Sequence, residues 1–404
     1  MADALHRIIA NRRGFLTMAT AAAALVPAAT RVGAKGHRRP LEKWRKAIIV
    51  NALGELDNPN VRDDGNPSTK RGLRIRHMLD ARTLSDAHAS GLTAVNCTLG
   101  YVSGEGDPYE RTISDIANYD QMIAAQSRDL CKILTTGDIV RAQRDGKIGL
   151  IYGFQNAAMV GDNLDRIDVF ADLGVRIIQL TYNPANQIGD GSMAPLNRGL
   201  TDFGREVVSR LNDNRIMVDL SHSGQKTCLE AARISRQPIS INHTGCRAVT
   251  ESPRNKTDEE LRLVAEKGGF VGIYFMPFLS PTMHVKADDI VRHIEHAVQI
   301  CGEDHVGIGT DGGVTQVDDL AAYTVALGKE VEQRKKLGIA ATGESADTYK
   351  FAIDMRGVGQ FQDLAGRLER RGFTAGRIEK ILGGNFLRYG RAVWGDDDGI
   401  AASA

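Results

Sequence analysis

The sequence predicts a (β/α)8 barrel, and three observations carry this prediction. Eight short apolar runs, many of them rich in β-branched residues, recur within about 270 residues. Most are separated by segments with helical spacing or helix-start signals, which is typical of a parallel sheet. No glycine-rich phosphate loop follows the first run, which disfavours a dinucleotide or P-loop fold. Eight such units suit a closed barrel better than an open sheet.

The N-terminal residues 1–34 have the features of a bacterial twin-arginine export signal. The pair Arg12-Arg13 precedes an apolar, alanine-rich run over 16–29, and small residues follow it. This run is shorter than the ~20 residues of a membrane-spanning helix, so we expect no stable anchor. We therefore expect a mature chain of residues 35–404, forming a single domain, in the periplasm or outside the cell.

The eight runs expected as strands alternate with the clearest helical segments. The strands are expected at Ala47–Leu53, Leu92–Leu99, Ile148–Phe154, Val175–Thr181, Ile216–Leu220, Pro238–Asn242, Phe270–Phe275 and Val306–Gly309. The helices are expected at Asp162–Leu173, Asp202–Leu211, Thr257–Lys267 and Ala287–Cys301. After the last strand, 312–345 reads as a polar insertion or flexible loop. Two further helices are expected at 361–371 and 375–382, the second ending at the glycine pair 383–384 as a C-cap.

Composition excludes several functional classes. The 404 residues carry 51 Lys plus Arg against 50 Asp plus Glu, a net charge of +1. A nucleic-acid-binding surface usually shows a clearer basic excess, so we expect no such partner. The five cysteines form no Cys-x-x-Cys pair, which argues against a zinc finger or a dithiol redox motif.

Polar side chains gather where expected strands end, which is where barrel enzymes carry their active sites. His222 follows the fifth strand, His243 the sixth, Gln155 the third and Asp311 the eighth. Two histidines at the same rim can converge on one metal ion, and neutral imidazole suits zinc and other borderline metals. An aspartate nearby can ligate the metal or take a proton from an activated water.

Several stretches in consistent order resemble the membrane (renal) dipeptidase family of metallopeptidases, in the amidohydrolase superfamily. They are Leu173–Asn183, Gly199–Gly204, Val218–His222, His243, Arg254-Asn255 with Asp258, His305–Asp311 and Gly383–Phe386. The resemblance covers nearly the whole mature chain. It implies a barrel that holds two metal ions, usually zinc, and cleaves the peptide bond of dipeptides.

The resemblance also assigns roles to individual positions. His222 and His243 match the histidine pair on one metal, and Asp311 matches the residue that handles the proton of the attacking water. Arg254 matches the arginine that holds the substrate carboxylate, and Asn255 stands beside it in the same substrate-binding motif. A guanidinium suits this role because it presents a planar, two-pronged donor.

Four positions depart from the family pattern. Leu53 stands where the family has a metal-binding histidine, and Glu55 replaces an aspartate ligand. Gln155 replaces the glutamate that bridges both ions, which removes a negative charge from the site. Tyr182 replaces a histidine that contacts the substrate carbonyl, and its hydroxyl can still donate to an oxyanion. From these departures we expect one zinc or other divalent ion, held by His222 and His243, with Gln155 and Glu55 as further candidate ligands.

Three functions remain open at this point. The first is a hydrolase of dipeptides or related small carboxylate-bearing amides. The second is altered chemistry on the same barrel, as a lyase, an isomerase or a hydrolase of a non-peptide compound. The third is a non-catalytic binding protein, against which the retention of both histidines and Asp311 argues. The family commonly forms homodimers, which is also an expectation for this chain.

Overall fold

The computed structural model describes residues 43–44, 46–61 and 78–395. They lie within Pro40–Ala404, one of the two units into which the chain divides. The expected export signal, residues 1–34, lies outside the described residues. Across the described part, no helix combines the length and the apolar character needed to cross a membrane.

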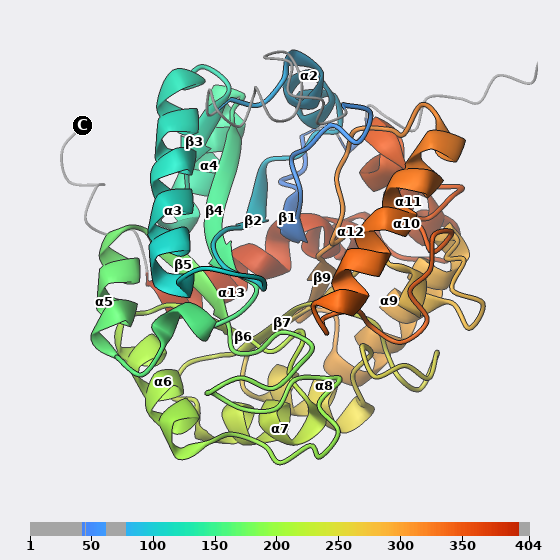
Figure 1. Cartoon of the computed structure of the whole chain (residues 1–404). Helices are drawn as coiled ribbons and strands as arrows, with labels where there is room; N and C mark the ends of the chain where they lie inside the picture. The colour runs from blue at the N-terminus through green and yellow to red at the C-terminus, as the bar shows by residue number, and fades with distance from the viewer. Residues whose placement is uncertain (1–42, 45, 62–77, 396–404) are drawn as a thin grey trace, which may run out of the picture. The chain divides into compact units, whose positions relative to one another are not determined.

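Eight parallel strands of the described chain form a nearly closed barrel with helices around it, as predicted (Figure 1). In barrel order they are β1 (Val50–Gly54), β2 (Ala94–Thr98), β4 (Ile148–Phe154), β5 (Val175–Gln179), β6 (Met217–Asp219), β7 (Ser240–Thr244), β8 (Phe270–Ile273) and β9 (Val306–Ile308). Backbone hydrogen bonds from Asp311 N to Leu53 O (2.9 Å) and from Glu55 N to Gly312 O (3.2 Å) join the two ends of the sheet. All eight expected strands are therefore present, with bounds that differ by a few residues.

A ninth strand, β3 (Leu130–Lys132), was not predicted. Among the described strands it pairs with β4 alone, beside the barrel path. Its three residues are too few to show an alternating pattern, so the sequence carries no distinct signal for it.

Helices cover the outside of the barrel, and many begin at a side-chain cap. Their bounds are α2 (Ala81–Ala89), α3 (Pro108–Ala125), α4 (Thr136–Asp145), α5 (Asp165–Asp172), α6 (Asp202–Asp213), α7 (Gln225–Ile234), α8 (Asp258–Glu266), α9 (Ala287–Cys301), α10 (Leu320–Lys336), α11 (Gln360–Arg370), α12 (Ala375–Glu379) and α13 (Asn385–Trp394). Thr257 and Glu260 form a reciprocal capping box at α8, which satisfies two amide groups that the helix leaves without partners.

Two apolar clusters hold these layers together. The larger cluster lies between the strands and the surrounding helices. The smaller one joins residues of several strands to α13, where Phe270 packs edge-to-face on Phe386 at 5.5 Å. Because apolar burial contributes about 25 cal/mol per Å², these clusters supply the main stabilisation of the barrel.

The expected C-cap at Gly383 and Gly384 is wrong. The chain stays helical there, passing through the π-helix η5 (Lys380–Gly384) into α13. A Cβ atom on Gly383 would lie 2.4 Å from the backbone oxygen of Ile48, just before β1. This glycine therefore allows a close approach between helix and strand instead of ending the helix.

The expected polar insertion after β9 contains the 17-residue helix α10. The side chain of Asp319 caps its first turn by accepting a hydrogen bond from Ala322 N at 3.0 Å. Only Leu327 and Val331 of this helix are buried. This sparse apolar pattern explains why the sequence did not predict the helix.

Candidate active site

His222 follows β6, and its ring has a defined tautomer. Its Nδ1 atom lies 2.7 Å from Oδ1 of Asn183. The amide of Asn183 is oriented by its Nδ2 group, which donates to the backbone oxygen of Ile339 at 2.8 Å. Because Oδ1 can only accept, Nδ1 of His222 carries the proton. Its Nε2 atom is then a lone-pair donor, and it has no hydrogen-bond partner among the described residues.

His243 lies in β7 beside His222. The ring centroids are 4.9 Å apart, with planes tilted by 57°. The His243 side chain is fully buried, and neither ring nitrogen has a hydrogen-bond partner in the described part of the chain. Burial, and then the charge of Arg254, lowers the pKa of both imidazoles well below the usual value. Both rings are therefore neutral near pH 7, the form that binds metal.

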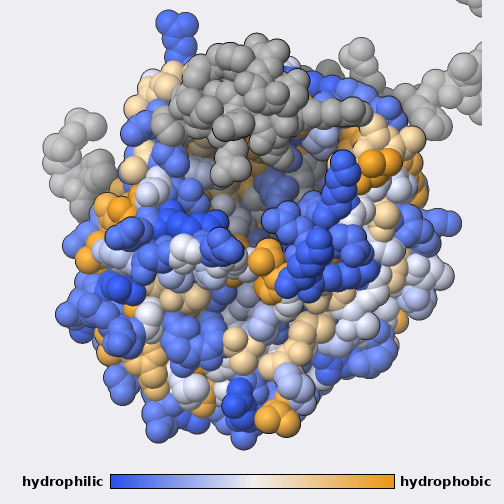
Figure 2. All heavy atoms as spheres, in the orientation of Figure 1, coloured by the Kyte–Doolittle hydropathy of each residue, from blue (hydrophilic) through white to orange (hydrophobic). Residues whose placement is uncertain are grey.

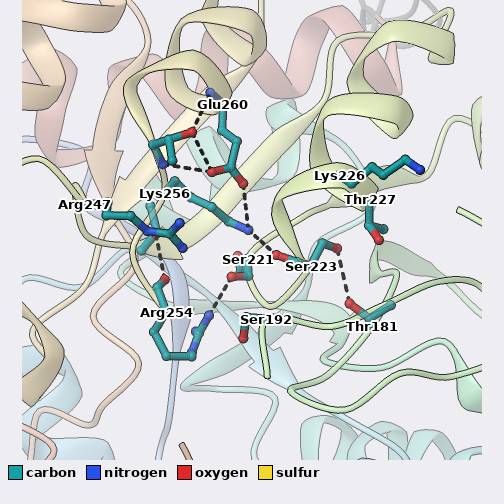
Figure 3. A network of polar contacts seen from close by, with 12 residues as sticks. Thr181, Ser192, Ser221, Ser223, Lys226, Thr227, Arg247, Arg254, Lys256 and Glu260 are labelled. Carbon is teal, nitrogen blue, oxygen red and sulfur yellow. Dashed lines mark hydrogen bonds and ion pairs between the residues drawn. The ribbon is translucent and has the colours of Figure 1, made fainter. Parts of the chain in front are cut away.

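Two buried cations hold the backbone on either side of His222 (Figure 3). Arg254 donates from Nη1 to the backbone oxygen of Ser221 at 2.7 Å. Lys256 donates from Nζ to the backbone oxygen of Ser223 at 2.5 Å. Both cations come from the loop after β7, so this loop fixes the segment that carries the histidine.

The charge of Lys256 is balanced by Glu260 at the start of α8. The two groups are 3.4 Å apart, and their side chains are only 2% and 1% exposed. Oε2 of Glu260 also accepts hydrogen bonds from the backbone N–H and the hydroxyl of Thr257, each at 2.8 Å. The ion pair therefore links the His222 segment to a capped helix.

Arg254 keeps one donor group for a ligand. Its side chain is 1% exposed, and its Nη2 atom has no hydrogen-bond partner among the described residues. It lines a cavity of about 280 Å³ together with His222, Tyr182 and Asp311. A buried, unsatisfied guanidinium nitrogen is costly, and an anionic group in the cavity would satisfy it.

Asn255, predicted beside Arg254 as a substrate-binding residue, does not line this cavity. Its Nδ2 group donates to the backbone oxygens of Thr250 and Phe278, and its Oδ1 atom accepts from the hydroxyl of Tyr274 at 2.6 Å. The geometry gives Asn255 the role of bracing the loop that presents Arg254.

Asp311 follows β9 in a left-handed backbone conformation, with φ of 57°. Such a conformation is uncommon outside glycine and often marks a functional position. The neighbouring Thr310 is held by Asn51, which accepts from its N–H and donates to its hydroxyl, each at 2.8 Å. Burial raises the pKa of Asp311 to about 6, although Arg254 and Lys350 favour its charged form.

Tyr182 follows β5 and packs on His222. The two rings stack at 4.2 Å with an interplanar angle of 19°. Its hydroxyl oxygen accepts a hydrogen bond from Nη1 of Arg334 at 3.2 Å, so its own proton remains available to another acceptor.

Two further predicted metal ligands line the cavity beside His222, whereas His243 is fully buried and is not among the lining residues. Gln155 and Glu55 both line it, and Leu53, which cannot bind metal, is buried. Gln155 uses its amide nitrogen to donate to the hydroxyl of Thr98 at 2.6 Å. Among the described side chains, no group of three or more His, Cys, Asp or Glu residues could hold a metal ion. Within the described part of the chain, two strong donors therefore lie together, His222 and His243, without a third of those types.

A second cavity, of about 800 Å³, shares part of its lining with the first. Glu55, Leu327, Glu330 and Lys350 border both. Figure 2 shows a hollow near the middle of the face seen in Figure 1, with mostly hydrophilic residues around it.

Three contributors to the site were missed by sequence reasoning. Asn183 stands in a stretch that carries the family resemblance, and Lys256 lies two residues beyond Arg254. These positions could have suggested a role. Arg334 lies on α10, in the segment expected to be an insertion or loop, and no sequence signal placed it near Tyr182.

Known proteins resemble this chain in sequence and in fold. Residues 79–336 match the family model described as membrane dipeptidase, peptidase family M19. An amidohydrolase from Pseudomonas aeruginosa is 32% identical, with a TM-score of 0.70, over 88% of this chain and 99% of that one. Dipeptidase tcpJ of Claviceps purpurea is 26% identical over 270 residues, 66% of this chain and 55% of that protein. The chain thus spans about half the length of this fungal relative.

A more distant structure shares the fold. A metallopeptidase from Rhodobacter sphaeroides, solved with a phosphinate mimic of the dipeptide L-Ala-D-Ala, is 20% identical. The likeness covers 86% of this chain and 100% of that one, with a TM-score of 0.65.

Proposed function

Because the chain belongs to the membrane dipeptidase family (peptidase family M19), we propose that it is a metal-dependent hydrolase of dipeptides or of related small amides that bear a carboxylate. This proposal rests on one observation: imidazole nitrogens and a guanidinium nitrogen without hydrogen-bond partners among the described residues lie close together. The buried imidazoles of His222 and His243 have unpartnered nitrogens, and Arg254 beside them has an unpartnered guanidinium nitrogen. A metal ion and a carboxylate would satisfy these groups together.

The donor set fits one divalent ion better than two. His222 Nε2 and a ring nitrogen of His243 would hold it, and the amide oxygen of Gln155 is a weaker candidate on the same cavity. On the side of Leu53 and Gln155, the described residues offer the carboxylate of Glu55 but no imidazole, and a neutral amide stands at the bridging position. The family is one of metallopeptidases, and zinc is the ion we propose. A bound ion supplies Lewis-acid polarisation and lowers the pKa of a water molecule.

The protein's own side chains then divide the work of hydrolysis. The Nη2 group of Arg254 binds the substrate carboxylate and orients the amide bond. Asp311, deprotonated above its pKa of about 6, takes the proton of the attacking water at its carboxylate oxygen. It then passes this proton to the leaving amine. The hydroxyl of Tyr182 donates a hydrogen bond to the carbonyl oxygen as negative charge develops there.

The test is a panel of dipeptides assayed with the zinc-reconstituted mature protein. We expect cleavage into two amino acids, abolished in His222→Ala and His243→Ala. The matched control is His284→Ala, because His284 is an exposed histidine with a 3.8 Å contact to Asp347. No cleavage of any dipeptide by the metal-loaded protein would refute the proposed activity.

The replacement of the bridging glutamate by Gln155 supports a second candidate, altered chemistry on the same barrel. The amide of Gln155 is already committed to Thr98, and a neutral amide organises an attacking water less well than a carboxylate. A lyase, an isomerase or a hydrolase of a non-peptide compound would then use the same Arg254 and Asp311. Metal-dependent conversion of a small carboxylic acid, with no dipeptide cleaved, would favour this candidate.

We also propose that the protein acts in the periplasm or outside the cell. The support is the twin-arginine motif at Arg12-Arg13 and the apolar run that follows it. Replacing the motif with Lys-Lys should keep the full-length protein in the cytoplasm, as cell fractionation would reveal.

A further inference from the structure

The cavity that His222 lines is also lined by the segment after β9. We call residues 320–350 the roof. This segment consists of α10, the long orange helix in Figure 1, and the chain that follows it. Eight roof residues line the cavity, and they are Leu327, Glu330, Val331, Arg334, Ile339, Glu344, Thr348 and Lys350. The roof therefore sets how much space a substrate finds above the barrel.

Arg334 is the centre of the roof's polar contacts. Its Nε and Nη2 atoms donate to the two carboxylate oxygens of Glu344 at 2.8 and 2.9 Å. Its Nη1 atom donates to the hydroxyl of Tyr182, which belongs to the barrel. Such a two-pronged pairing fixes the plane of the guanidinium as well as its position. The side chains of Arg334 and Glu344 are only 20% and 11% exposed, so solvent weakens this pairing less than it would on the surface.

The barrel residues beneath Arg334 are those that contact His222. Tyr182 stacks on the His222 ring, and Asn183 orients that ring through Nδ1. Asn183 is itself bound to the roof, because its Nδ2 group donates to the backbone oxygen of Ile339. The roof is therefore attached next to the proposed metal-binding histidine.

Apolar packing of the roof is concentrated beyond α10, where Ile339 and Ala341 are buried. Of the 17 residues of α10, only Leu327 and Val331 are buried. A segment with few buried apolar groups has a low free energy of local opening. The contacts of Arg334 should therefore account for much of what keeps α10 in place.

We propose that Arg334 is a specificity-determining residue, which anchors the roof on Tyr182 and so restricts the site to molecules of about dipeptide size. The cavity that the roof lines measures about 280 Å³, just below the range of roughly 300–1,000 Å³ typical of pockets for drug-sized ligands. The identity of the substrate rests on the proposed function, whereas the anchoring of the roof does not.

The first test measures the roof itself, by hydrogen–deuterium exchange of the intact protein. In Arg334→Met, amides of 320–350 should exchange at least about tenfold faster than in the wild type, which corresponds to about 1.4 kcal/mol of local opening. Lys335→Met is the matched control. Its side chain lies one residue along the same helix, is 51% exposed and pairs with the exposed Glu332. Unchanged exchange in Arg334→Met would overturn the proposal.

The second test measures selection by size, with L-Ala-L-Ala and L-Ala-L-Ala-L-Ala as the probes. In the wild type and in Lys335→Met, kcat/KM should favour the dipeptide strongly. In Arg334→Met the ratio of the two kcat/KM values should fall by about tenfold or more, because the longer peptide no longer meets a closed roof. Arg334→Lys, which keeps the charge but loses the two-pronged geometry, should lie between them.

The two tests separate the possible failures. Faster exchange with an unchanged size ratio would show that Arg334 anchors the roof without selecting substrate, and would overturn its role in specificity. If the wild-type protein cleaves neither peptide, the role of Arg334 in selecting between them fails, and the wider dipeptide panel decides the proposed activity. The exchange measurement still decides whether Arg334 anchors the roof.

Discussion

Nδ1 of His222 lies 2.7 Å from Oδ1 of Asn183, and this contact determines which nitrogen of the histidine faces a ligand. The amide cannot be turned without losing its bond to the backbone oxygen of Ile339. The contact therefore favours the tautomer with the proton on Nδ1. The lone pair of Nε2 is then free to bind an ion.

Asn183→Leu should weaken zinc binding by about 10- to 100-fold, the usual effect of removing a group that orients a ligating histidine. Asn183→Asp keeps an acceptor facing Nδ1 and should retain most of the affinity. Chelator competition measures both. Asn186→Leu is the control. It removes an amide from the same loop, and that amide donates to Asn156 and to the backbone oxygen of Leu180 instead of to His222. Equal affinities in all three variants would contradict the role of Asn183.

Arg254→Met should lower kcat/KM for a dipeptide by about 10²-fold or more, since losing a buried, charged contact costs about 2–5 kcal/mol. The same dipeptide with its C-terminal carboxylate converted to an amide should already be a poor substrate of the wild type. Its kcat/KM should fall little further in Arg254→Met. Steady-state kinetics measures this difference. Arg247→Met, on the same loop, removes an arginine whose Nε contacts the backbone oxygen of Ser252, and should have little effect. Equal losses on both substrates would point to a structural role for Arg254.

Activity should depend on the ionisation of Asp311. Its pKa is raised to about 6, and only the deprotonated form can accept a proton. The value of kcat/KM should therefore be about tenfold below its plateau at pH 5 and should level off above pH 7. A pH profile measured at saturating zinc tests this. Asp311→Asn should lower kcat by about 10²-fold or more and remove this dependence. An activity that stays flat between pH 5 and pH 7 would be incompatible with Asp311 as the base.

The same carboxyl group should lower the stability of the metal-free protein at alkaline pH. Asp311 binds its proton more tightly in the folded protein, where its pKa is about 6, than in the unfolded chain, where its pKa has the ordinary value of 3.8. Its charge therefore costs up to about 3 kcal/mol above pH 6, and this cost disappears as the pH falls from about 6 towards 4. Asp311→Asn should unfold at higher urea concentration than the wild type at pH 8. The difference should vanish below pH 4, and a difference independent of pH would rule out this origin.

The buried pair of Lys256 and Glu260 should be sensitive to loss of one partner. Lys256→Met leaves the Glu260 carboxylate buried beside an apolar side chain, which typically costs about 3–5 kcal/mol. The double variant Lys256→Met/Glu260→Gln removes both charges, keeps an oxygen acceptor for the cap at Thr257, and should recover much of the loss. Urea denaturation of the two variants gives the comparison. Equal stabilities for the single and double variants would show that the charge pairing is unimportant.

The barrel was predictable because each strand repeats the same local signal. Apolar runs such as Ile148–Phe154 are buried from end to end and were placed correctly by composition alone. Gly383 was misread because its meaning is tertiary. A glycine that admits a close backbone neighbour looks the same in sequence as one that caps a helix.

The site was predictable in part for the same reason. One cavity is lined by six of the predicted site residues, because the carboxyl ends of barrel strands and their loops meet at one face. They are His222, Arg254, Asp311, Gln155, Glu55 and Tyr182. The partners that tune them were less visible. Arg334 reaches Tyr182 from 152 residues away, through a helix with little apolar pattern. Asn255 stands beside Arg254 in sequence, yet its side chain is used to brace the loop.

The most direct test of the central claim is the metal content of the mature protein, purified without chelator and measured by elemental mass spectrometry. The donor set predicts about one divalent ion per chain, lost in His222→Ala and in His243→Ala and retained in His284→Ala. Two tightly bound ions per chain, or a single ion that survives the loss of either buried histidine, would contradict a one-metal site built on this pair.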